Sequence, residues 1–393
     1  MLITTLFYQN YNYGGILQAY ALYKKIEDMG FNCEELNYTQ IITNKLLKLV
    51  YRFHRIFEIL SDLGYETEMK KSLSNDGILH EEYLKMSNGD VLKYKFDLFI
   101  QNNFKTTKLY NPSNIRRIDK DYDFYITGGD QVWNPDWTDS NYFLKFAKQG
   151  RKIAYSCSAG KDNFSYNDKK KIKKYIKNLD VISVREKNFS EMLNKESIEN
   201  KIIADPVFLF DKKFWEDFSD NIEYTNEKYI FAYLLGNDKE RRDQIKIFAK
   251  KNNLKIVSIP NVFRKYNKFD DDFADIKVSN AGPREFVSLI KNSEFVMTDS
   301  FHGTSFSIIF EKQFLNFSRF SSNDTRSLNV RLKNVLFEYD LQNRMVDVSN
   351  ISKISLDDIG KIDYNKCRIV TDNKREKAIE FLKENLLDKH LWS

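Results

Sequence analysis

The sequence predicts an α/β protein, because one local pattern recurs along the chain. A short apolar strand runs into a turn of glycines or small polar residues, and a helix with one apolar face follows. The pattern occurs at residues 2–29, where Gly14 and Gly15 mark the turn, and again at residues 295–311. Alternating strands and helices are typical of parallel sheets covered by helices, in which ligands bind at the carboxyl ends of the strands.

Length and composition allow two such units. The chain has 393 residues, of which 42% are hydrophobic, and this is enough for two cores. A polar stretch at residues 212–226 is the best candidate for a linker, and a second α/β unit begins with the apolar strand 229–235. Residues 374–387 carry apolar side chains at helical spacing and predict a last helix.

The charge balance and the cysteines exclude several classes of protein. Lys and Arg number 62 against 56 Asp and Glu, so the net charge is only +6, and no nucleic-acid partner is expected. The three cysteines are widely spaced, which indicates a reducing compartment without disulfide bonds. The chain begins with an apolar strand rather than a leader, and no apolar run has the length of a membrane span. We therefore expect a cytoplasmic protein.

Residues 44–60 could still bring the protein to a membrane surface. Their pattern predicts an amphipathic helix whose apolar face is edged by basic side chains, including Lys48 and Arg52. Such helices can lie on anionic membranes, which would place the protein at the inner face of the cytoplasmic membrane. An ordinary helix packed on the sheet explains the same pattern, and we prefer that interpretation.

The stretch 294–310 is the strongest candidate for a functional site. Its strand ends in Thr-Asp-Ser, residues that often cap helices, and His302 and Gly303 precede a predicted helix at residues 304–311. Amide groups at the start of a helix favour an anion. His302 lies close to the hydroxyl of Ser300 and to a glycine that would let a ligand approach, so it is a candidate acid or base. A histidine that merely stabilises the turn is the alternative.

The first strand leads into a second candidate, the loop at residues 10–15. Asn12 and Gly14 lie in this loop, but the glycines are not arranged as GxGxxG, so a dinucleotide site is not indicated. The loop either contacts a sugar or a phosphate through its backbone, or simply lets the strand and the helix pack closely.

Polar side chains also follow two other predicted strands. Asp130, Gln131 and Asn134 could present one carboxylate and two amides to a polyhydroxy ligand, or they could form an Asx-type turn. Arg185 follows a further strand, where its guanidinium could bind an anion through two hydrogen bonds. Pairing of Arg185 with Glu186 is the competing explanation.

Taken together, these motifs resemble those of the polysaccharide pyruvyl transferase family. The resemblance extends from residue 1 to about residue 335. It rests on residues 12–22, 128–134, 184–186, 205–206 and, above all, on the sequence TDSFHGT at residues 298–304. The last motif is specific when it occurs together with DQVWN at residues 130–134.

The resemblance implies a glycosyltransferase-B-like fold, in which two Rossmann-like domains face a cleft. We expect an N-terminal domain on the acceptor side at residues 1–215 and a C-terminal domain on the donor side at residues 216–360. The C-terminal helix, within residues 361–393, is expected to pack back on the N-terminal domain.

The resemblance also implies a reaction. A pyruvyl group moves from phosphoenolpyruvate to two hydroxyls of a sugar, which gives a cyclic ketal and releases phosphate. The acceptor implied is galactose in a lipid-linked or nascent polysaccharide unit, with a polyprenyl diphosphate as the lipid carrier. Phosphoenolpyruvate is a co-substrate, and this chemistry requires no cofactor and no metal.

The candidate residues take expected roles in this reaction. We expect His302 as the acid and Asp130 as the base. The donor would be bound by Arg185, Ser300 and Gly303, and the acceptor by Asn12, Gly14, Gln131 and Asn134. Two alternatives stay open: a nucleotide-sugar-dependent glycosyltransferase of the same architecture, and a non-catalytic carbohydrate-binding protein that has kept the fold.

Overall fold

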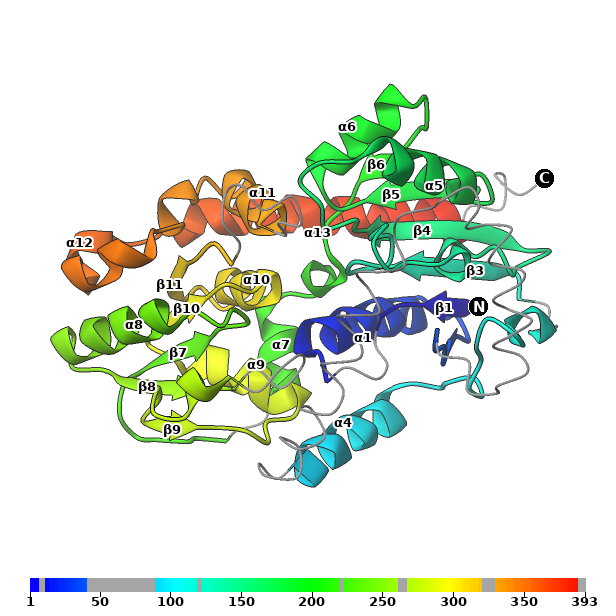
Figure 1. Ribbon diagram of the computed structural model, residues 1–393. Coiled ribbons are helices and arrows are strands. Elements are labelled where there is room, and N and C mark those ends of the chain that lie inside the picture. The colour runs from blue at the N-terminus through cyan, green and yellow to red at the C-terminus, as the bar shows by residue number, and fades with distance from the viewer. Residues whose placement is uncertain are drawn as a thin grey trace.

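Two parallel β-sheets, each covered by helices, form the framework of the protein (Figure 1). The computed structural model describes residues 1–6, 11–40, 89–118, 122–219, 222–260, 267–319 and 329–387. The predicted α/β class is confirmed. Each sheet belongs to its own domain, which we call the N-terminal and the C-terminal domain.

The N-terminal sheet has six strands in the order β2-β1-β3-β4-β5-β6, and every adjacent pair is parallel. The strands are β1 (Leu2–Thr4), β2 (Glu34–Glu35), β3 (Phe124–Gly128), β4 (Arg151–Cys157), β5 (Val181–Val184) and β6 (Lys201–Ile202). The helices of this domain are α1 (Tyr13–Asp28), α4 (Gly89–Asn103), α5 (Tyr166–Ile176), α6 (Lys187–Lys195) and α7 (Lys212–Phe218). Strand β3 is buried along its whole length, as expected for a central strand of a parallel sheet that is covered on both faces.

The C-terminal sheet has five parallel strands in the order β11-β10-β7-β8-β9. The strands are β7 (Tyr229–Tyr233), β8 (Lys255–Ser258), β9 (Ile276–Lys277), β10 (Phe295–Thr298) and β11 (Gln313–Asn316). The helices are α8 (Lys239–Lys251), α9 (Pro283–Asn292), α10 (Phe301–Ile309), α11 (Val330–Glu338) and α12 (Leu356–Ile359).

Each sheet reverses its strand order at one place. In the N-terminal sheet the chain builds β2 on one side of β1 and β3 on the other. In the C-terminal sheet it builds β8 and β9 on one side of β7, and β10 and β11 on the other. Connections leave such a switch point in opposite directions, which opens a crevice at the carboxyl ends of the two strands. Asp130 follows β3, and His302 follows β10, so each switch point carries one predicted catalytic residue.

Helix α1 lies between the two domains (Figure 1) and packs on α9 and α10 of the C-terminal domain. Its first residue, Tyr13, is fully buried. The Tyr13 ring stacks on Phe286 at a centroid distance of 4.7 Å, and its hydroxyl donates a hydrogen bond to the Ala281 carbonyl at 2.7 Å. One apolar core therefore runs through both domains without a break.

The last long helix, α13 (Tyr364–Leu386), spans both domains along one side of the molecule (Figure 1). It begins ten residues earlier than the predicted helix at residues 374–387, because its first turns are mostly exposed and lack a clear apolar stripe. Near its end it returns to the N-terminal domain, where Asn385 accepts a hydrogen bond from Arg151 at 3.0 Å and Phe381 packs on Tyr155.

Two helices begin earlier than the sequence predicts. The sequence predicts a turn at the glycines of residues 14–15, but they lie in the first turn of α1, after Asn12 as the N-cap. The Asn12 side chain accepts a hydrogen bond from the backbone N–H of the second glycine at 3.1 Å. Helix α10 likewise begins at Phe301, so His302 lies within its first turn and not before it. Helical periodicity does not reveal these starts, because both first turns are buried on every side.

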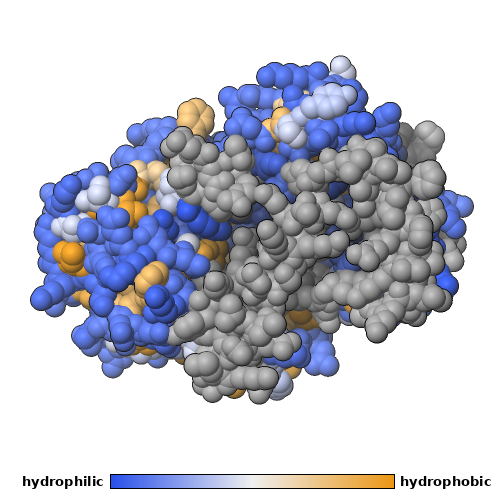
Figure 2. Space-filling model, viewed as in Figure 1, coloured by the Kyte–Doolittle hydropathy of each residue, from blue (hydrophilic) through white to orange (hydrophobic). Residues whose placement is uncertain are grey.

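The surface of the described residues is mainly hydrophilic on the face seen in Figure 2, with scattered apolar side chains. No described helix combines the length and the apolar character needed to cross a membrane. The predicted amphipathic helix at residues 44–60 lies outside the described residues.

The position of Tyr13 predicts that the two domains unfold together. Tyr13→Ala should lower the free energy of unfolding by ~3–5 kcal/mol, because it removes a buried aromatic ring from the shared core. Tyr13→Phe removes only the hydrogen bond to Ala281 and should cost about 1 kcal/mol. Urea denaturation followed by fluorescence and by circular dichroism measures both values. Two separate transitions in the wild-type protein would contradict the shared core.

Candidate active site

The carboxyl ends of β7 and β10 are tied together by Asp299. Its carboxylate accepts hydrogen bonds from the backbone N–H groups of Leu235 at 2.8 Å and Gly236 at 2.9 Å, and from the Arg241 guanidinium at 2.8 Å. The Ser300 hydroxyl then caps α10. These contacts fix the turn in which the histidine of the TDSFHGT motif lies.

His302 projects from this turn towards the N-terminal domain. Its Nε2 atom lies 3.6 Å from Oδ2 of Asp205, which follows β6 in the N-terminal domain. The His302 side chain is only 6% exposed, so residues of both domains enclose the imidazole ring. On its other edge the ring lies against Gly14, at the start of α1.

Arg185, directly after β5, is the centre of a buried group of ion pairs. Its guanidinium donates hydrogen bonds to Glu186 Oε1 at 3.0 Å and to Asp205 Oδ2 at 2.5 Å, and it lies 3.5 Å from Asp130 Oδ1. The ring of Phe301 covers the guanidinium, with the centroid 4.2 Å from Cζ. The pairing with Glu186 that the sequence suggests is present, but it is one of three.

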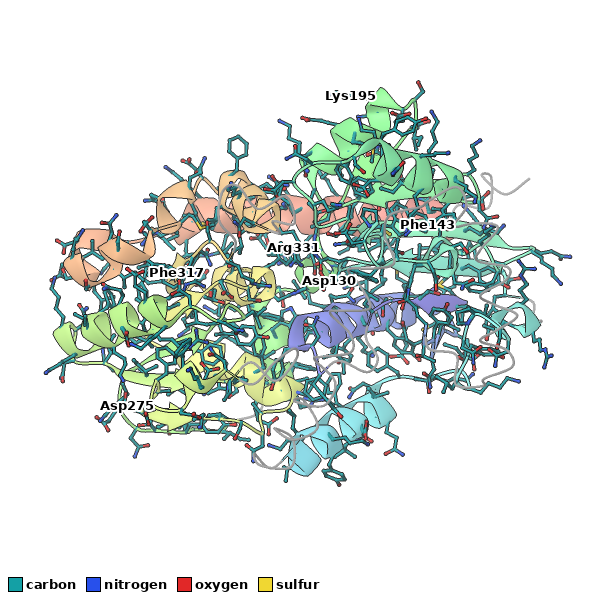
Figure 3. All side chains as sticks on the ribbon, in the orientation of Figure 1. Asp130, Phe143, Lys195, Asp275, Phe317 and Arg331 are labelled. Atoms are coloured by element: carbon teal, nitrogen blue, oxygen red, sulfur yellow. The ribbon has the colours of Figure 1, made fainter. Side chains whose placement is uncertain are left out.

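Asp130 also pairs with a guanidinium group of the opposite domain. Nη1 of Arg331, on α11, donates a hydrogen bond to Asp130 Oδ1 at 3.0 Å. Figure 3 labels both residues close together near the centre of the molecule, where the domains meet. We call the group formed by Asp130, Arg185, Glu186, Asp205, His302 and Arg331 the interdomain cluster.

The charges of the interdomain cluster stabilise one another in spite of burial. Burial alone would raise the pKa of the Asp205 carboxyl, but the neighbouring His302 and Arg185 lower it to about 2. The pKa of Asp130 is lowered as well, because Arg331, His302 and Arg185 together outweigh its burial. Burial lowers the pKa of Arg331 to about 10, and this side chain therefore remains protonated at neutral pH.

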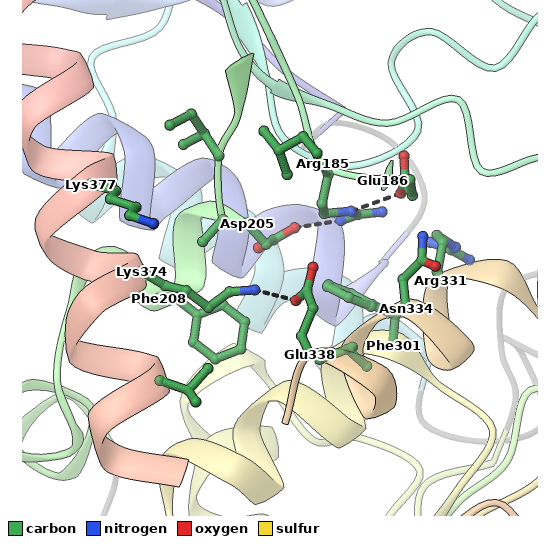
Figure 4. A pocket seen from close by; sticks show the side chains of 15 residues that line it. Arg185, Glu186, Asp205, Phe208, Phe301, Arg331, Asn334, Glu338, Lys374 and Lys377 are labelled. Atoms are coloured by element: carbon green, nitrogen blue, oxygen red, sulfur yellow. Dashed lines mark hydrogen bonds and ion pairs between the residues drawn. The ribbon is translucent and has the colours of Figure 1, made fainter. Parts of the chain in front are cut away.

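A cavity of about 340 Å³ opens beside the interdomain cluster (Figure 4). Arg185, Asp205 and Arg331 line it, and an ion pair between Lys374 of α13 and Glu338 of α11 lies near them. His302 does not line the cavity itself, but it lies next to Asp205, which does. Two guanidinium groups are thus within reach of a small anion.

The other predicted binding residues have structural partners of their own. The Ser300 hydroxyl accepts a hydrogen bond from the Gly303 N–H at 3.3 Å, and Gly303 itself packs against Thr298. The Asn134 side chain accepts a hydrogen bond from the Asp136 N–H at 3.0 Å, so it forms the Asx-type turn that the sequence left open.

Asn12 is occupied as the cap of α1, and Gln131 packs against Gly160 with its Nε2 atom buried and unpartnered. The structure brings His302, Asp130, Arg185 and Gly14 together.

Arg331 and the partnership of Asp205 with His302 are not predicted from the sequence. Arg331 lies on a helix with ordinary spacing, and no local motif marks it. Asp205 does occur in a motif, Asp205-Pro206, whose carboxylate caps the following turn by accepting a hydrogen bond from the Val207 N–H at 3.1 Å. Among the described residues, no group of three or more His, Cys, Asp or Glu side chains could hold a metal ion.

The lowered pKa of Asp205 predicts acid sensitivity. A carboxyl with a lower pKa in the folded than in the unfolded protein stabilises the fold above its unfolded pKa of about 3.9, and this stabilisation is lost as the pH falls towards 2. Urea denaturation at several pH values should therefore show a steeper loss of stability below about pH 4 for the wild type than for Asp205→Asn. Equal slopes would contradict the ion pairing of this carboxylate.

The comparisons with solved structures identify the architecture. A structure described as a UDP-N-acetylglucosamine 2-epimerase from Listeria monocytogenes aligns with 99% of this chain and 97% of its own, at 10% identity and a TM-score of 0.54. A second UDP-N-acetylglucosamine 2-epimerase structure aligns with 99% of this chain and 96% of its own, at 10% identity and a TM-score of 0.51. The protein therefore has a glycosyltransferase-B-like fold with two Rossmann-like domains, as predicted.

Sequence comparisons give the family. No curated protein matches the chain significantly. The family model described as polysaccharide pyruvyl transferase matches residues 12–322, a range that contains Gly14, Asp130, Arg185 and His302. The chain belongs to the polysaccharide pyruvyl transferase family.

Proposed function

We propose that the protein transfers the pyruvyl group of phosphoenolpyruvate to two hydroxyls of a sugar and releases phosphate. Family membership supports pyruvyl transfer to a polysaccharide. The observation that carries the proposal is the interdomain cluster, in which the carboxylate and the histidine that follow the two switch points lie beside two guanidinium groups.

The donor is a small molecule with a carboxylate and a phosphate. Such a ligand requires fixed cations, and Arg185 and Arg331 provide two guanidinium groups that suit bidentate binding of carboxylate or phosphate. Both are held by carboxylates before any ligand arrives, so they need little reorganisation when the donor binds. The first-turn amides of α10 add a favourable dipole for an anion.

His302 is the proposed acid of the first step. The protonated imidazole gives its proton to the methylene carbon of the donor, and the double-bond electrons form the new C–H bond. The adjacent carbon becomes cationic, and the oxygen of one sugar hydroxyl attacks it, with loss of the hydroxyl proton. The bond from this carbon to the phosphate oxygen then breaks, and phosphate leaves with the bonding electrons. The second hydroxyl attacks the same carbon and loses its proton, which closes the ketal.

Asp130 is the proposed acceptor of the first hydroxyl proton. Its lowered pKa makes it a weak base, but a hydroxyl that attacks a cationic carbon becomes strongly acidic, so a weak base is sufficient. The ion pair with Arg331 keeps the carboxylate ionised and oriented. The overall proton balance is neutral, because one hydroxyl proton replaces the proton that His302 gave away and the other leaves with phosphate or solvent.

For the acceptor we propose galactose in a lipid-linked or nascent polysaccharide unit, reached from the side of α1. A polyprenyl diphosphate carrier would place the protein at a membrane surface, with residues 44–60 as the contact. Vesicle flotation of the wild type and of the Lys48→Glu/Arg52→Glu variant tests this contact. Equal flotation of the two proteins would remove the membrane role from this segment.

Removal of the imidazole should nearly abolish turnover. His302→Ala is expected to reduce phosphate release from phosphoenolpyruvate, in the presence of galactosides, by about 100- to 10,000-fold. His302→Gln keeps the size of the side chain but cannot act as an acid at neutral pH, so it should be equally impaired. Near-normal release by His302→Gln at saturating donor would rule out the acid role.

Arg331 should act mainly on donor binding. Arg331→Ala is expected to raise the KM for phosphoenolpyruvate by ~10- to 100-fold, as loss of a hydrogen bond to a charged group implies. Arg368→Ala is the matched control, because Arg368 pairs with Glu311 on the exposed side of α13.

Thermal-shift measurements with a panel of ligands separate this function from its alternative. Phosphoenolpyruvate should stabilise the protein, and uridine or guanosine diphosphate sugars should not. The reverse pattern would favour a nucleotide-sugar glycosyltransferase.

A further inference from the structure

The imidazole of His302 occupies a slot in the opposite domain. Asp205 faces its Nε2 atom at 3.6 Å, and Gly14 faces its Nδ1 atom. Both Asp205 and Gly14 belong to the N-terminal domain, whereas His302 belongs to the C-terminal domain. The two ring nitrogens therefore have different neighbours, and neither neighbour comes from the element that carries the histidine.

The Asp205 side of the slot is rigid. Oδ1 of Asp205 accepts a hydrogen bond from the Val207 N–H at 3.1 Å, and Oδ2 accepts one from Arg185. The carboxylate is fully buried and ionised, so a proton on Nε2 is attracted to it and a lone pair on Nε2 is repelled. The separation of 3.6 Å is an ion-pair distance that a small rotation of the ring converts into a hydrogen bond. Nε2 is buried without any other partner.

The Gly14 side of the slot has no space for a side chain. A Cβ atom on Gly14 would lie 2.0 Å from Nδ1 and 2.5 Å from Cγ of His302. Gly14 cannot simply move away, because Asn12 caps the helix before it and Tyr13 is anchored between Phe286 and Ala281. A glycine at this position lets the imidazole enter and leaves Nδ1 on the side of α1.

We propose that Asp205 and Gly14 are positioning residues for His302. Asp205 keeps the proton of the neutral ring on Nε2, and Gly14 leaves the space that the imidazole occupies. Their effect on turnover rests on the proposed function, whereas the slot itself does not.

Nuclear magnetic resonance of the free full-length protein tests the Asp205 half. The chain has four histidines, so ¹⁵N-labelled histidine rings give few signals, and the loss of one set in His302→Gln assigns His302. We expect the neutral His302 ring to carry its proton on Nε2. In Asp205→Asn the amide keeps its oxygen towards Val207 and turns its NH₂ group towards the ring, which should shift the proton to Nδ1. An Nδ1–H tautomer in the wild type, or the same tautomer in a folded Asp205→Asn variant, would overturn the proposal.

Thermal unfolding tests the Gly14 half without any substrate. Gly14→Ala should lower Tm by ~2–6 °C in the presence of His302, and should have no such effect in the His302→Ala background, where the clashing ring is gone. Gly15→Ala is the matched control. Its Cβ would meet the Leu6 carbonyl oxygen at 2.7 Å and not the histidine, so its effect should be the same in both backgrounds. An equal loss for Gly14→Ala in both backgrounds would exclude the slot.

The experiments distinguish a failure of the positioning proposal from a failure of the proposed function. The tautomer and the Tm cycle are measured without donor or acceptor, so they stand even if no phosphate is released. Turnover gives the functional link: Gly14→Ala should lower kcat by roughly 100-fold at saturating donor, as a displacement of a catalytic group by about 1 Å implies. An unchanged kcat in a protein that shows the Tm coupling would exclude Gly14 as a positioning residue for the reaction.

Discussion

The structure depends on one electrostatic constraint, which is that charges buried at a domain boundary must be paired. Asp130, Glu186 and Asp205 lie where the two domains meet, and each is almost completely enclosed. Carboxylates in such a position are strongly unfavourable unless cations reach them. Arg185 from the same domain and Arg331 from the other provide these cations. The domains are therefore held in one relative position by the same charges that can bind an anionic donor.

The topology explains why these groups meet. A parallel sheet directs the loops at its carboxyl edge into a crevice wherever the strand order reverses, and this protein has two such edges that face each other. Asp299 and the cap at Ser300 fix one edge, and the ion pairs of Arg185 fix the other. A histidine at one edge and carboxylates at the other then come into contact without any long loop. The arrangement suits proton transfer to a ligand held between the domains.

Much of this could be read from the sequence, since the α/β class, the strand ends and His302, Asp130 and Arg185 all follow local patterns. What the sequence does not contain is the pairing between distant segments. Arg331 lies 201 positions from Asp130, on a helix without a motif, so only the folded chain reveals their contact. The sequence predicts the starts of α1 and α10 too late, because a helix that is buried on all sides has no amphipathic pattern. The family resemblance implies that Asn12 and Asn134 bind the acceptor, and in the structure their side chains form a helix cap and an Asx-type turn. Their binding roles remain predictions.

The central position of α1 also affects how the protein is made. This helix is buried along most of its length, yet Tyr13 donates its hydrogen bond to Ala281, which lies 268 positions later in the chain, and stacks on Phe286. The sheet beside it is covered in part by Phe381, close to the end of α13. We therefore expect the apolar surface of α1 to stay partly uncovered until the segments that follow residue 281 have been translated. Such a nascent chain is an expected client of chaperones, and its yield should depend on the speed of translation.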